Sequence, residues 1–221
     1  MISDIATQGT GMLAMFVNLD QEYRKEFRVW LKQDMFTARI KIGFEACASY
    51  DLLPGTDAGK ERSQSFLTVY QTPSLGVLYS QPYQRLREVR DKKDAEFHKK
   101  FLDAERYTLS WVGPELASET REFAPLIYVD RFDVIDEDKE EFNKWFVSEY
   151  LPACEKIKSM TRLRHYTAME GFKNTLLFHE FDNVSAVNDK LWETLRERTS
   201  RDQIIRRSGG SAGYRRVISA T

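Results

Sequence analysis

The sequence predicts an α+β fold in which a β-α-β-β-α-β unit occurs twice and the two antiparallel sheets pack together as an α/β barrel. Three observations lead to this prediction. A Glu-Phe-x-x-Trp motif occurs at residues 26–30 and again at 141–145. A Leu-Arg-Glu motif ends a later helical stretch in each half, at 86–88 and 195–197. Short apolar stretches recur in the same order around these motifs, which is the signature of an internal repeat.

Eight stretches are predicted to be strands because each is short, apolar and bounded by turn residues. Four fall in each half, at corresponding places around the repeated motifs. The first four span residues 11–19, 44–50, 65–71 and 105–112, and the second four span 124–132, 162–169, 174–182 and 213–219.

Four amphipathic helices are predicted between these strands, at 25–42, 74–88, 140–157 and 183–197. Trp30 and Trp145 occupy the same position of the repeated motif, and each is expected to anchor its helix on a sheet. Pro82 is expected to kink or split the second helix. The run of mixed charges at 85–100, which includes His98, is expected to form a solvated helical face.

The repeat divides the chain into two units, residues 10–113 and 124–220, joined by a polar linker at 113–125. A β-α-β-β-α-β order is typical of a ferredoxin-like unit, with helices on one face of its sheet. The other face has to be covered or polar. Two such sheets in one chain can cover each other, which favours a barrel.

Composition limits the classes of function. The 221 residues are 42% hydrophobic and 30% charged, as is ordinary for a globular protein, and the formal net charge is −1. With this charge balance the protein has no net positive charge that would attract nucleic acid or an anionic membrane. Cys47 and Cys154 lack CxxC spacing and are expected to be buried free thiols. No apolar run approaches the roughly 20 residues that span a bilayer, and the first residues lack signal-peptide features. We therefore expect a soluble, cytoplasmic protein with a small-molecule partner, and we leave a homodimer open.

Candidate catalytic residues lie on the predicted hairpin of the second half. If this hairpin turns about Phe172, His165 faces His179, Arg164 faces Glu180 and Arg162 faces Asp182. Alternation then places both histidines on a mostly apolar face. The other members of that face are Leu163, Thr167, Leu177 and Phe181.

Two buried imidazoles could accept and donate a proton near neutral pH, so His165 and His179 are the acid/base candidates and Tyr150 is a candidate donor. The candidate substrate contacts are Arg164, Tyr166, Trp145 and Tyr70. Two structural alternatives stay open: each histidine forms a hydrogen bond in the core, and Arg162 and Arg164 form cross-strand ion pairs. No metal site is expected, because a third ligand is missing. The glycine-rich stretch 206–216 lacks phosphate-loop spacing and is expected to be a flexible loop.

Three stretches of the second half, "FNKWFVSEYLP" (142–152), "TRLRHYTAMEG" (161–171) and "LLFHEFDN" (176–183), resemble the dimeric α/β-barrel superfamily. The similarity is to its EthD-like and antibiotic-biosynthesis-monooxygenase-like families, and the first half resembles a more eroded copy. The resemblance implies the fold more firmly than the reaction, because the superfamily includes isomerases, lyases, cyclases, dehalogenases and oxygenases.

One departure from the family pattern affects mechanism. The helix histidine of the relatives is Tyr150 here and Met35 in the first half, so a mechanism that needs that histidine cannot be carried over. Chlorite dismutases and related haem proteins also fuse two such units and hold haem through a histidine of the C-terminal half. The second half of this chain has no helix histidine, which disfavours haem.

From the residues and the resemblance we expect a cofactor-independent enzyme that transfers protons in a small aromatic, lactone or polyketide-like molecule. Its reaction would be of the isomerase, lyase or cyclase type, with an oxygenase as a further class. The alternatives are a non-catalytic barrel protein that binds a small molecule or serves a structural role, and a haem protein.

Overall fold

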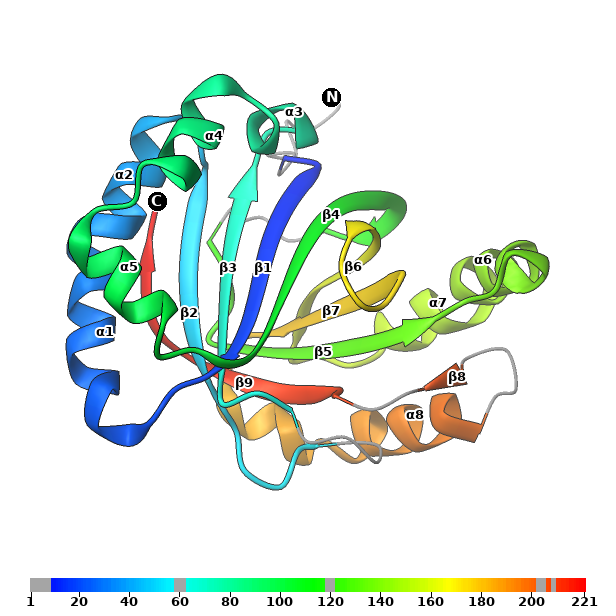
Figure 1. Cartoon of the computed structure of the whole chain (residues 1–221). Coiled ribbons are helices and arrows are strands. Elements are labelled where there is room, and N and C mark those ends of the chain that lie inside the picture. The colour runs from blue at the N-terminus through cyan, green and yellow to red at the C-terminus, as the bar shows by residue number, and fades with distance from the viewer. Residues whose placement is uncertain (1–8, 58–62, 118–121, 202–205, 208–209) are drawn as a thin grey trace, which may run out of the picture.

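The computed structural model describes residues 9–57, 63–117, 122–201, 206–207 and 210–221. They form a closed antiparallel barrel with helices packed outside it (Figure 1). The ring runs β7-β6-β4-β1-β3-β2-β9-β5 and closes because β5 also pairs with β7. Its strands are β1 (Gly11–Asn18), β2 (Ala46–Leu52), β3 (Phe66–Thr72), β4 (Leu102–Leu116), β5 (Leu126–Asp133), β6 (Met160–Glu170), β7 (Thr175–Phe181) and β9 (Ala212–Ala220).

The predicted α+β class and the barrel are confirmed, and the strand boundaries need two corrections. β4 continues to Leu116, so the stretch 113–116 is strand rather than linker. The reason is that β4 pairs with β1 on one side and with β6 on the other, and the β6 partner extends it. In the stretch 206–216, expected to be a loop leading into the strand at 213–219, residues 206–207 form the short strand β8 (Arg206–Arg207), and β9 begins at Ala212.

Both halves arrange their strands in the same order. The first half has the order β4-β1-β3-β2, and the second half has β9-β5-β7-β6. Counting only the ring strands of each half, the fourth is followed by the first, the third and the second. The halves meet where β4 pairs with β6 and β2 pairs with β9, which turns two open sheets into one closed ring.

Side chains fill the interior of the barrel. Large aromatic rings such as Phe16, Tyr107 and Tyr214 alternate with alanines such as Ala14, Ala48 and Ala212, and all are buried. Phe16 contacts the rings of Tyr107 and Tyr214 edge to face, at centroid distances of 5.7 and 6.0 Å. An eight-stranded barrel is just wide enough for side chains to fill it, so the interior is a packed core.

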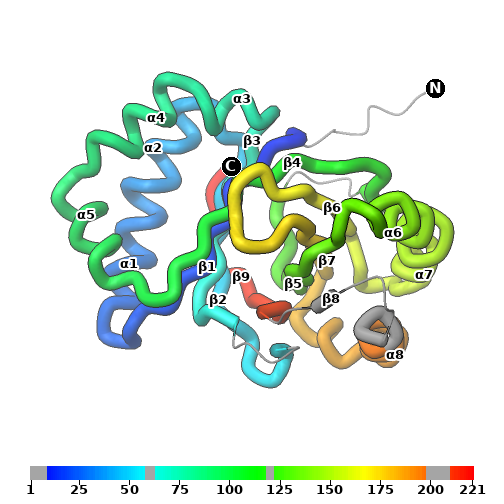
Figure 2. The backbone as a smooth tube through the Cα atoms, turned by 45° about the vertical axis from the view of Figure 1, so that its right-hand side comes forward, coloured from blue at the N-terminus to red at the C-terminus, as the bar shows by residue number. Residues whose placement is uncertain are grey.

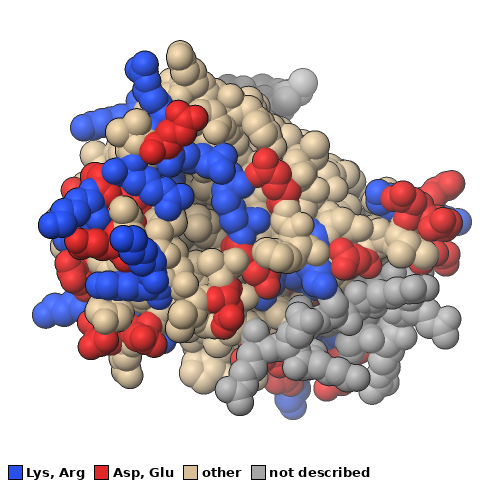
Figure 3. Space-filling view, in the orientation of Figure 1, with Lys and Arg blue, Asp and Glu red and all other residues tan. Residues whose placement is uncertain are grey.

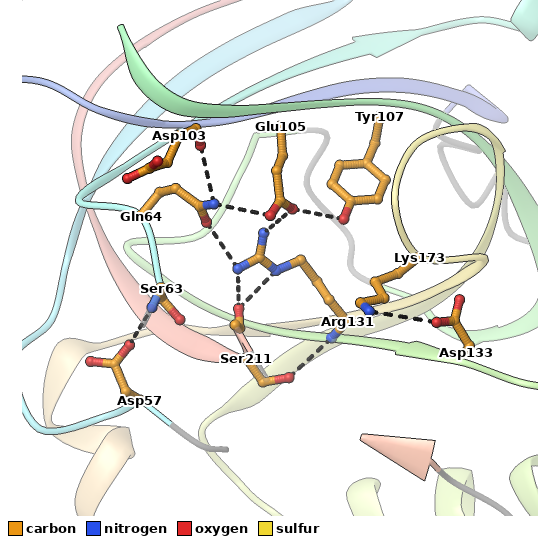
Figure 4. Close-up of polar contacts among 11 residues, drawn as sticks. Asp57, Ser63, Gln64, Asp103, Glu105, Tyr107, Arg131, Asp133, Lys173 and Ser211 are labelled. Carbon is orange, nitrogen blue, oxygen red and sulfur yellow. Dashed lines mark hydrogen bonds and ion pairs between the residues drawn. The ribbon is translucent and has the colours of Figure 1, made fainter. Parts of the chain in front are cut away.

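A polar network joins β4, β5 and the loop before β9 inside the barrel (Figure 4). The Arg131 guanidinium, 2% exposed, donates to Glu105 Oε2 at 2.8 Å and to Gln64 Oε1 at 3.0 Å. Its Nε donates to the Gly210 carbonyl at 2.7 Å. Glu105 also accepts from the Tyr107 hydroxyl at 2.9 Å. These contacts give the buried cation several partners, as a buried charge requires.

The first helical layer covers β1 and β3 on one side of the barrel (Figure 2). After the turn η1 (Gln21–Tyr23) it consists of α1 (Arg24–Trp30), the π-helical turn η2 (Leu31–Met35), α2 (Phe36–Lys41), α3 (Leu75–Leu78), α4 (Gln81–Glu88) and α5 (Lys92–His98). Pro82 lies in the first turn of α4, so the predicted split of the helix at 74–88 is confirmed. Asp91 caps α5 by accepting from the Asp94 backbone N–H at 2.8 Å.

The second helical layer covers the other half of the barrel, on the far side from the first (Figures 1 and 2). It consists of η3 (Asp136–Asp138), α6 (Lys139–Trp145), the π-helical turn η4 (Phe146–Tyr150), α7 (Leu151–Cys154), η5 (Val184–Asn188) and α8 (Lys190–Arg201). The π-helical turns η2 and η4 lie 115 residues apart, which is the offset of the repeated sequence motif. No helix in the described part of the chain is long and apolar enough to cross a membrane.

Candidate functional site

The hairpin register of the second half differs from the prediction. His179 faces Leu163, and His165 faces Leu177, so the two histidines are diagonal neighbours and not a directly opposed pair. The turn lies at Gly171, which has a φ of 149°, rather than at Phe172. The register therefore shifts by two residues, and because two is the side-chain period of a strand, both histidines keep the predicted face.

The side chains of Tyr150 and His179 are in contact, as expected if the helix that carries Tyr150 packs against the face of the histidines. The Tyr150 hydroxyl and His179 Nε2 are 2.8 Å apart. His179 Nδ1 lies 3.1 Å from the Tyr128 carbonyl oxygen and therefore donates to it, which leaves Nε2 to accept from the tyrosine. The Trp192 ring packs 4.9 Å from the imidazole. All of these side chains are buried between the barrel and the second helical layer.

His165 lies apart from that pair, between the rings of Phe142 and Phe146, each 5.3 Å from its imidazole. Burial lowers the pKa of His165 to about 4, because the apolar surroundings disfavour the charged imidazolium. The imidazole is therefore neutral at pH 7.

This pKa makes stability depend on pH in a defined direction. As pH falls from about 6.5 toward 4, the unfolded chain binds a proton at His165 that the folded chain does not, so the free energy of unfolding decreases. Between pH 7 and pH 4, this proton uptake should lower the free energy of unfolding of the wild-type protein by about 3 kcal/mol. In His165→Leu this contribution should be absent. Urea denaturation of both proteins at pH 7, 5.5 and 4 measures it, and parallel pH profiles would contradict the prediction.

The two arginines of β6 point into the barrel, and their predicted partners were wrong because of the register shift. Arg162 pairs with Glu180 at 2.9 Å instead of Asp182. Arg164 Nε lies 2.8 Å from Glu115 Oε2, and its Nη1 donates to Gln71 Oε1 at 2.9 Å. The open alternative of ion pairs is therefore what the structure shows, although between different residues.

The other predicted substrate contacts are scattered. Tyr166 is buried inside the barrel, among the residues of its core. Trp145 is half-buried on α6 and packs 4.7 Å from the Tyr150 ring. Tyr70 faces the first helical layer and lines a cavity there. Of the seven predicted site residues, the structure brings Tyr150 into contact with His179 and Trp145, and it places Tyr70 at a cavity in the other half.

That cavity lies between the barrel and the first helical layer and consists of two adjoining pockets that share four lining residues; the apolar pocket is called the inner chamber and the more polar one the outer chamber. The inner chamber, about 20 Å³, has apolar and aromatic walls that include Phe27, Trp30 and Phe101. The outer chamber, about 70 Å³, is more polar. Both chambers are lined by Met15, Met35, Arg39 and His98. An inner chamber of this size holds one water molecule, so a ring can enter only if the wall moves. Methionine side chains are flexible enough to provide that movement.

The imidazole of His98 is oriented by Asp94, one turn earlier on α5. His98 Nδ1 is 2.9 Å from the Asp94 carbonyl oxygen and 2.9 Å from Asp94 Oδ1. Nδ1 is therefore the protonated nitrogen, and Nε2 is left as an acceptor with no hydrogen bond from the described residues. Asp94 is 5% exposed, and Arg90 Nε lies 3.9 Å from its other oxygen. His98, expected to be solvated, is half-buried: its side chain is 29% exposed and lines both chambers.

Arginines surround the outer chamber. Arg39, Arg87, Arg90 and Arg106 line it together with one carboxylate, Asp94. Basic side chains gather over α4, α5 and β4 on this face of the molecule (Figure 3). Arg106 pairs with Glu170 at the tip of β6, which also accepts from the Thr108 hydroxyl at 2.9 Å. A cavity with apolar walls and a few convergent polar groups is the usual form of a small-molecule site.

Sequence reasoning missed Arg39, Asp94 and His98. Asp94 and His98 had a signal, since residues four apart on a helix are neighbours. The signal was hidden in a run of both charges, where such pairs are ordinary on a solvated face. Arg39 gave none, because its burial depends on how α2 packs on the sheet. The described residues contain no group of three or more His, Cys, Asp or Glu side chains that could hold a metal.

At the level of sequence, neither a family model nor a curated protein matches the chain. Solved structures match over nearly its whole length. An anthrone oxidase-like protein has a TM-score of 0.64 at 12% identity, covering 97% of this chain and 93% of that one. A protein assigned as a monooxygenase from Lactobacillus acidophilus NCFM has a TM-score of 0.59 at 14% identity, covering 96% of both chains. A mutant chlorite dismutase from Candidatus Nitrospira defluvii has a TM-score of 0.59 at 11% identity, covering 98% and 95%.

These neighbours belong to the dimeric α/β-barrel superfamily that the second half of the sequence resembles. At 10–14% identity the likeness concerns fold and leaves chemistry open. The chain has the closed α/β-barrel fold of that superfamily.

Proposed function

We propose that the protein is an enzyme that transfers a proton to or from a small, partly aromatic molecule bound in the first-half cavity. One observation carries the proposal: at the junction of the two chambers, His98 Nδ1 donates to the Asp94 backbone carbonyl beside the buried Asp94 carboxylate, which leaves Nε2 as an acceptor. An imidazole that is held in one tautomer by a hydrogen bond at Nδ1 and has a carboxylate nearby is suited to act as a general base.

The surrounding residues suit such a reaction. The aromatic walls of the inner chamber exclude water from a bound ring, which strengthens polar interactions with it. The imidazolium formed when His98 accepts a proton would be stabilised by the Asp94 carboxylate beside Nδ1. This proposal keeps the proton-transfer chemistry expected from the sequence and moves it from the second half to the first.

Tyr150, the candidate donor, and His179, one of the two acid/base candidates, are in contact in the second half. Their hydrogen bond resembles a donor–base pair, but His179 uses both ring nitrogens within the protein. They do not line either chamber of the first-half cavity. We therefore propose that they stabilise the packing of the second helical layer, as the structural alternative held.

We propose that the reaction needs no cofactor. Haem does not fit the histidines of the second half: His179 has no ring nitrogen left for iron, and the phenyl rings of Phe142 and Phe146 enclose His165. An axial imidazole has to present a nitrogen to the metal. The names of the neighbours include an oxidase and monooxygenases, so oxygen consumption is the result to test against simple proton transfer.

We also propose that the two halves are copies of one ferredoxin-like unit. The common strand order and the π-helical turns at the same offset of 115 residues support the duplication. A π-helical turn is rare and is often found at functional sites. In the first half this turn carries Met35 to the cavity, and in the second half it carries Tyr150 to His179.

Deuterium exchange tests the proposed reaction. Anthrone, a weak carbon acid, is incubated with the protein in buffered D2O, and exchange at its CH2 carbon is followed by NMR while an electrode records oxygen. We expect catalysed exchange that falls about 100-fold in His98→Gln, since a general base contributes about 10²–10⁴-fold. Exchange without oxygen uptake indicates an isomerase-type reaction, and oxygen uptake in step with exchange indicates an oxygenase.

Two variants serve as controls. Lys99→Gln changes the exposed neighbour of His98 and should exchange at the wild-type rate. His179→Gln breaks the second-half pair and should exchange at that rate in the fraction that folds. If His179→Gln loses exchange while His98→Gln keeps it, the reaction belongs to the second half. A wild-type rate equal to that of free imidazole would contradict the proposal altogether.

A further inference from the structure

Arg39 is a buried cation without a counterion in the part of the chain that the structure describes. Its side chain is on α2 and the residue is 8% exposed. The guanidinium lies over the Tyr70 ring, with its carbon 4.3 Å from the ring centroid. Its Nε and Nη1 atoms are buried and have no hydrogen-bond partner among the described residues. It faces both chambers of the cavity.

The other buried arginines of the described chain differ in this respect. Arg131, Arg162 and Arg164 have carboxylate partners in Glu105, Glu180 and Glu115, at 2.8, 2.9 and 2.8 Å. Removing a guanidinium from water is costly unless a paired charge and hydrogen bonds compensate. Each of these three guanidinium groups is therefore neutralised by a carboxylate, whereas Arg39 has no carboxylate partner among the described residues.

Groups near Arg39 do not supply the missing negative charge. Burial raises the pKa of the Cys47 thiol to about 12 and also raises the pKa of the Tyr70 phenol, so both stay neutral at pH 7. Asp94 lines the same outer chamber, but its carboxylate is already beside His98 and Arg90. The outer chamber retains an excess of positive charge.

The barrel itself does not require a cation at this position. At the offset of 115 residues that relates the two π-helical turns, Arg39 corresponds to Cys154, which is fully buried in the apolar core of the second half. A small uncharged side chain thus satisfies the packing of the equivalent helix. The packing of this helix therefore does not explain the guanidinium of Arg39, which lines the cavity.

We propose that Arg39 binds the carboxylate of the substrate, and that the substrate is a small aromatic carboxylic acid. The acid group lies at Arg39, between the chambers, and the ring lies against the aromatic walls of the inner chamber once the methionine side chains of its wall have moved aside. The indole Nε1 of Trp30, which lines that chamber and has no partner among the described residues, offers a second donor. Arginine suits a planar carboxylate, to which it can donate two parallel hydrogen bonds. This inference names the substrate class of the proposed enzyme and rests on that proposal for the location of catalysis.

Binding of matched ligands tests the inference. The probes are 2-naphthoate and its neutral isostere 2-naphthamide, with benzoate as a smaller acid, measured by isothermal titration calorimetry at pH 7. Wild-type protein should bind 2-naphthoate at least tenfold more tightly than 2-naphthamide. In Arg39→Met the affinity for 2-naphthoate should fall at least tenfold, while the affinity for the amide stays within twofold. Arg39→Lys should recover part of the preference, because it keeps the charge and loses the planar fork.

A matched control separates a direct contact from the general positive field. Arg87→Met removes the same charge from an exposed position at the rim of the outer chamber, and should change the affinity for 2-naphthoate less than threefold. Thermal unfolding adds a second readout. Arg39→Met should unfold at the wild-type temperature or above it, since an uncompensated buried charge is removed. A large decrease in that temperature would show a structural role instead.

The outcomes distinguish this inference from the proposed reaction. If His98→Gln binds 2-naphthoate normally and exchange is unaffected by that variant, the catalytic proposal fails and the carboxylate site stands. The carboxylate site is overturned if Arg39→Met binds 2-naphthoate as tightly as wild type does. It is also overturned if wild-type protein shows no preference for the acids over the amide, including the case in which millimolar concentrations of all three fail to bind.

Discussion

Replacing Trp30 with alanine is expected to lower the free energy of unfolding by about 3–5 kcal/mol, the usual cost of removing a large buried aromatic ring. Trp30 is 2% exposed and packs against Phe27 and Phe97, with centroid distances of 5.8 and 5.1 Å. It holds α1 and α5 against the outer face of the barrel. Urea denaturation followed by circular dichroism measures the change.

Trp145 provides the matched comparison, because it occupies the same motif position on α6. The sequence predicted equal roles, whereas the structure leaves Trp145 half-buried and places it against Tyr150 and Phe142. Less apolar surface is lost on truncation, so Trp145→Ala should cost about 1–2 kcal/mol. Equal costs for the two variants, or a cost below 1 kcal/mol for Trp30→Ala, would show that burial of the ring does not determine how much stability each truncation removes.

Replacing Glu180 with leucine is expected to cost a similar 3–5 kcal/mol, for an electrostatic reason. Glu180 Oε1 lies 2.9 Å from Arg162 Nη1, and both side chains are 3% exposed. Its other oxygen accepts from the Ala124 backbone N–H at 2.8 Å. The variant would remove the Glu180 carboxylate from beside the buried Arg162 guanidinium, which is much more costly than losing an exposed pair. Equilibrium unfolding in urea gives the value.

Two further variants identify the cause of that loss. The double variant Arg162→Leu/Glu180→Leu removes both charges and should recover most of the lost stability, since an apolar pair often replaces a buried ion pair at little cost. Glu170→Leu breaks the more exposed pair with Arg106 and should cost less than about 1 kcal/mol. A double variant as unstable as Glu180→Leu would mean that lost packing, and not the loss of the carboxylate beside Arg162, explains the result.

The sequence predicted the elements well where local rules decide them. Alternating strands, the amphipathic helices and the break at Pro82 depend on short-range periodicity and on proline geometry, and they are confirmed by the structure. The face shared by His165, His179, Leu163 and Leu177 was also predicted, because a shift of two residues leaves the faces of a strand unchanged. The pairing itself was wrong, since it depends on which residue, Gly171 or Phe172, forms the turn.

The candidate site could not be located from local patterns. The two halves have similar helices, but different side chains occupy the space between the helices and the barrel. In the second half, the side chains of Tyr150, His179 and Trp192 pack together. The aligned residues of the first half are Met35, Tyr70 and Tyr83, and these line the cavity. The sequence favoured the half with two histidines. The structure shows that those histidines complete a core, while the flexible methionine and the added helix α5 leave space in the other half.

The sequence by itself determined the α+β class, the repeated order of elements and the residues that each strand and helix turns toward the core. These features follow from side-chain periodicity and turn chemistry, which act over a few residues. The tertiary structure alone decided which half holds the cavity, and it alone placed the Asp94–His98 pair of α5 beside Arg39 of α2. The physical reason is that burial, cavity volume and charge compensation depend on side chains from distant segments, whose distances are set only when the barrel closes and both helical layers pack against it.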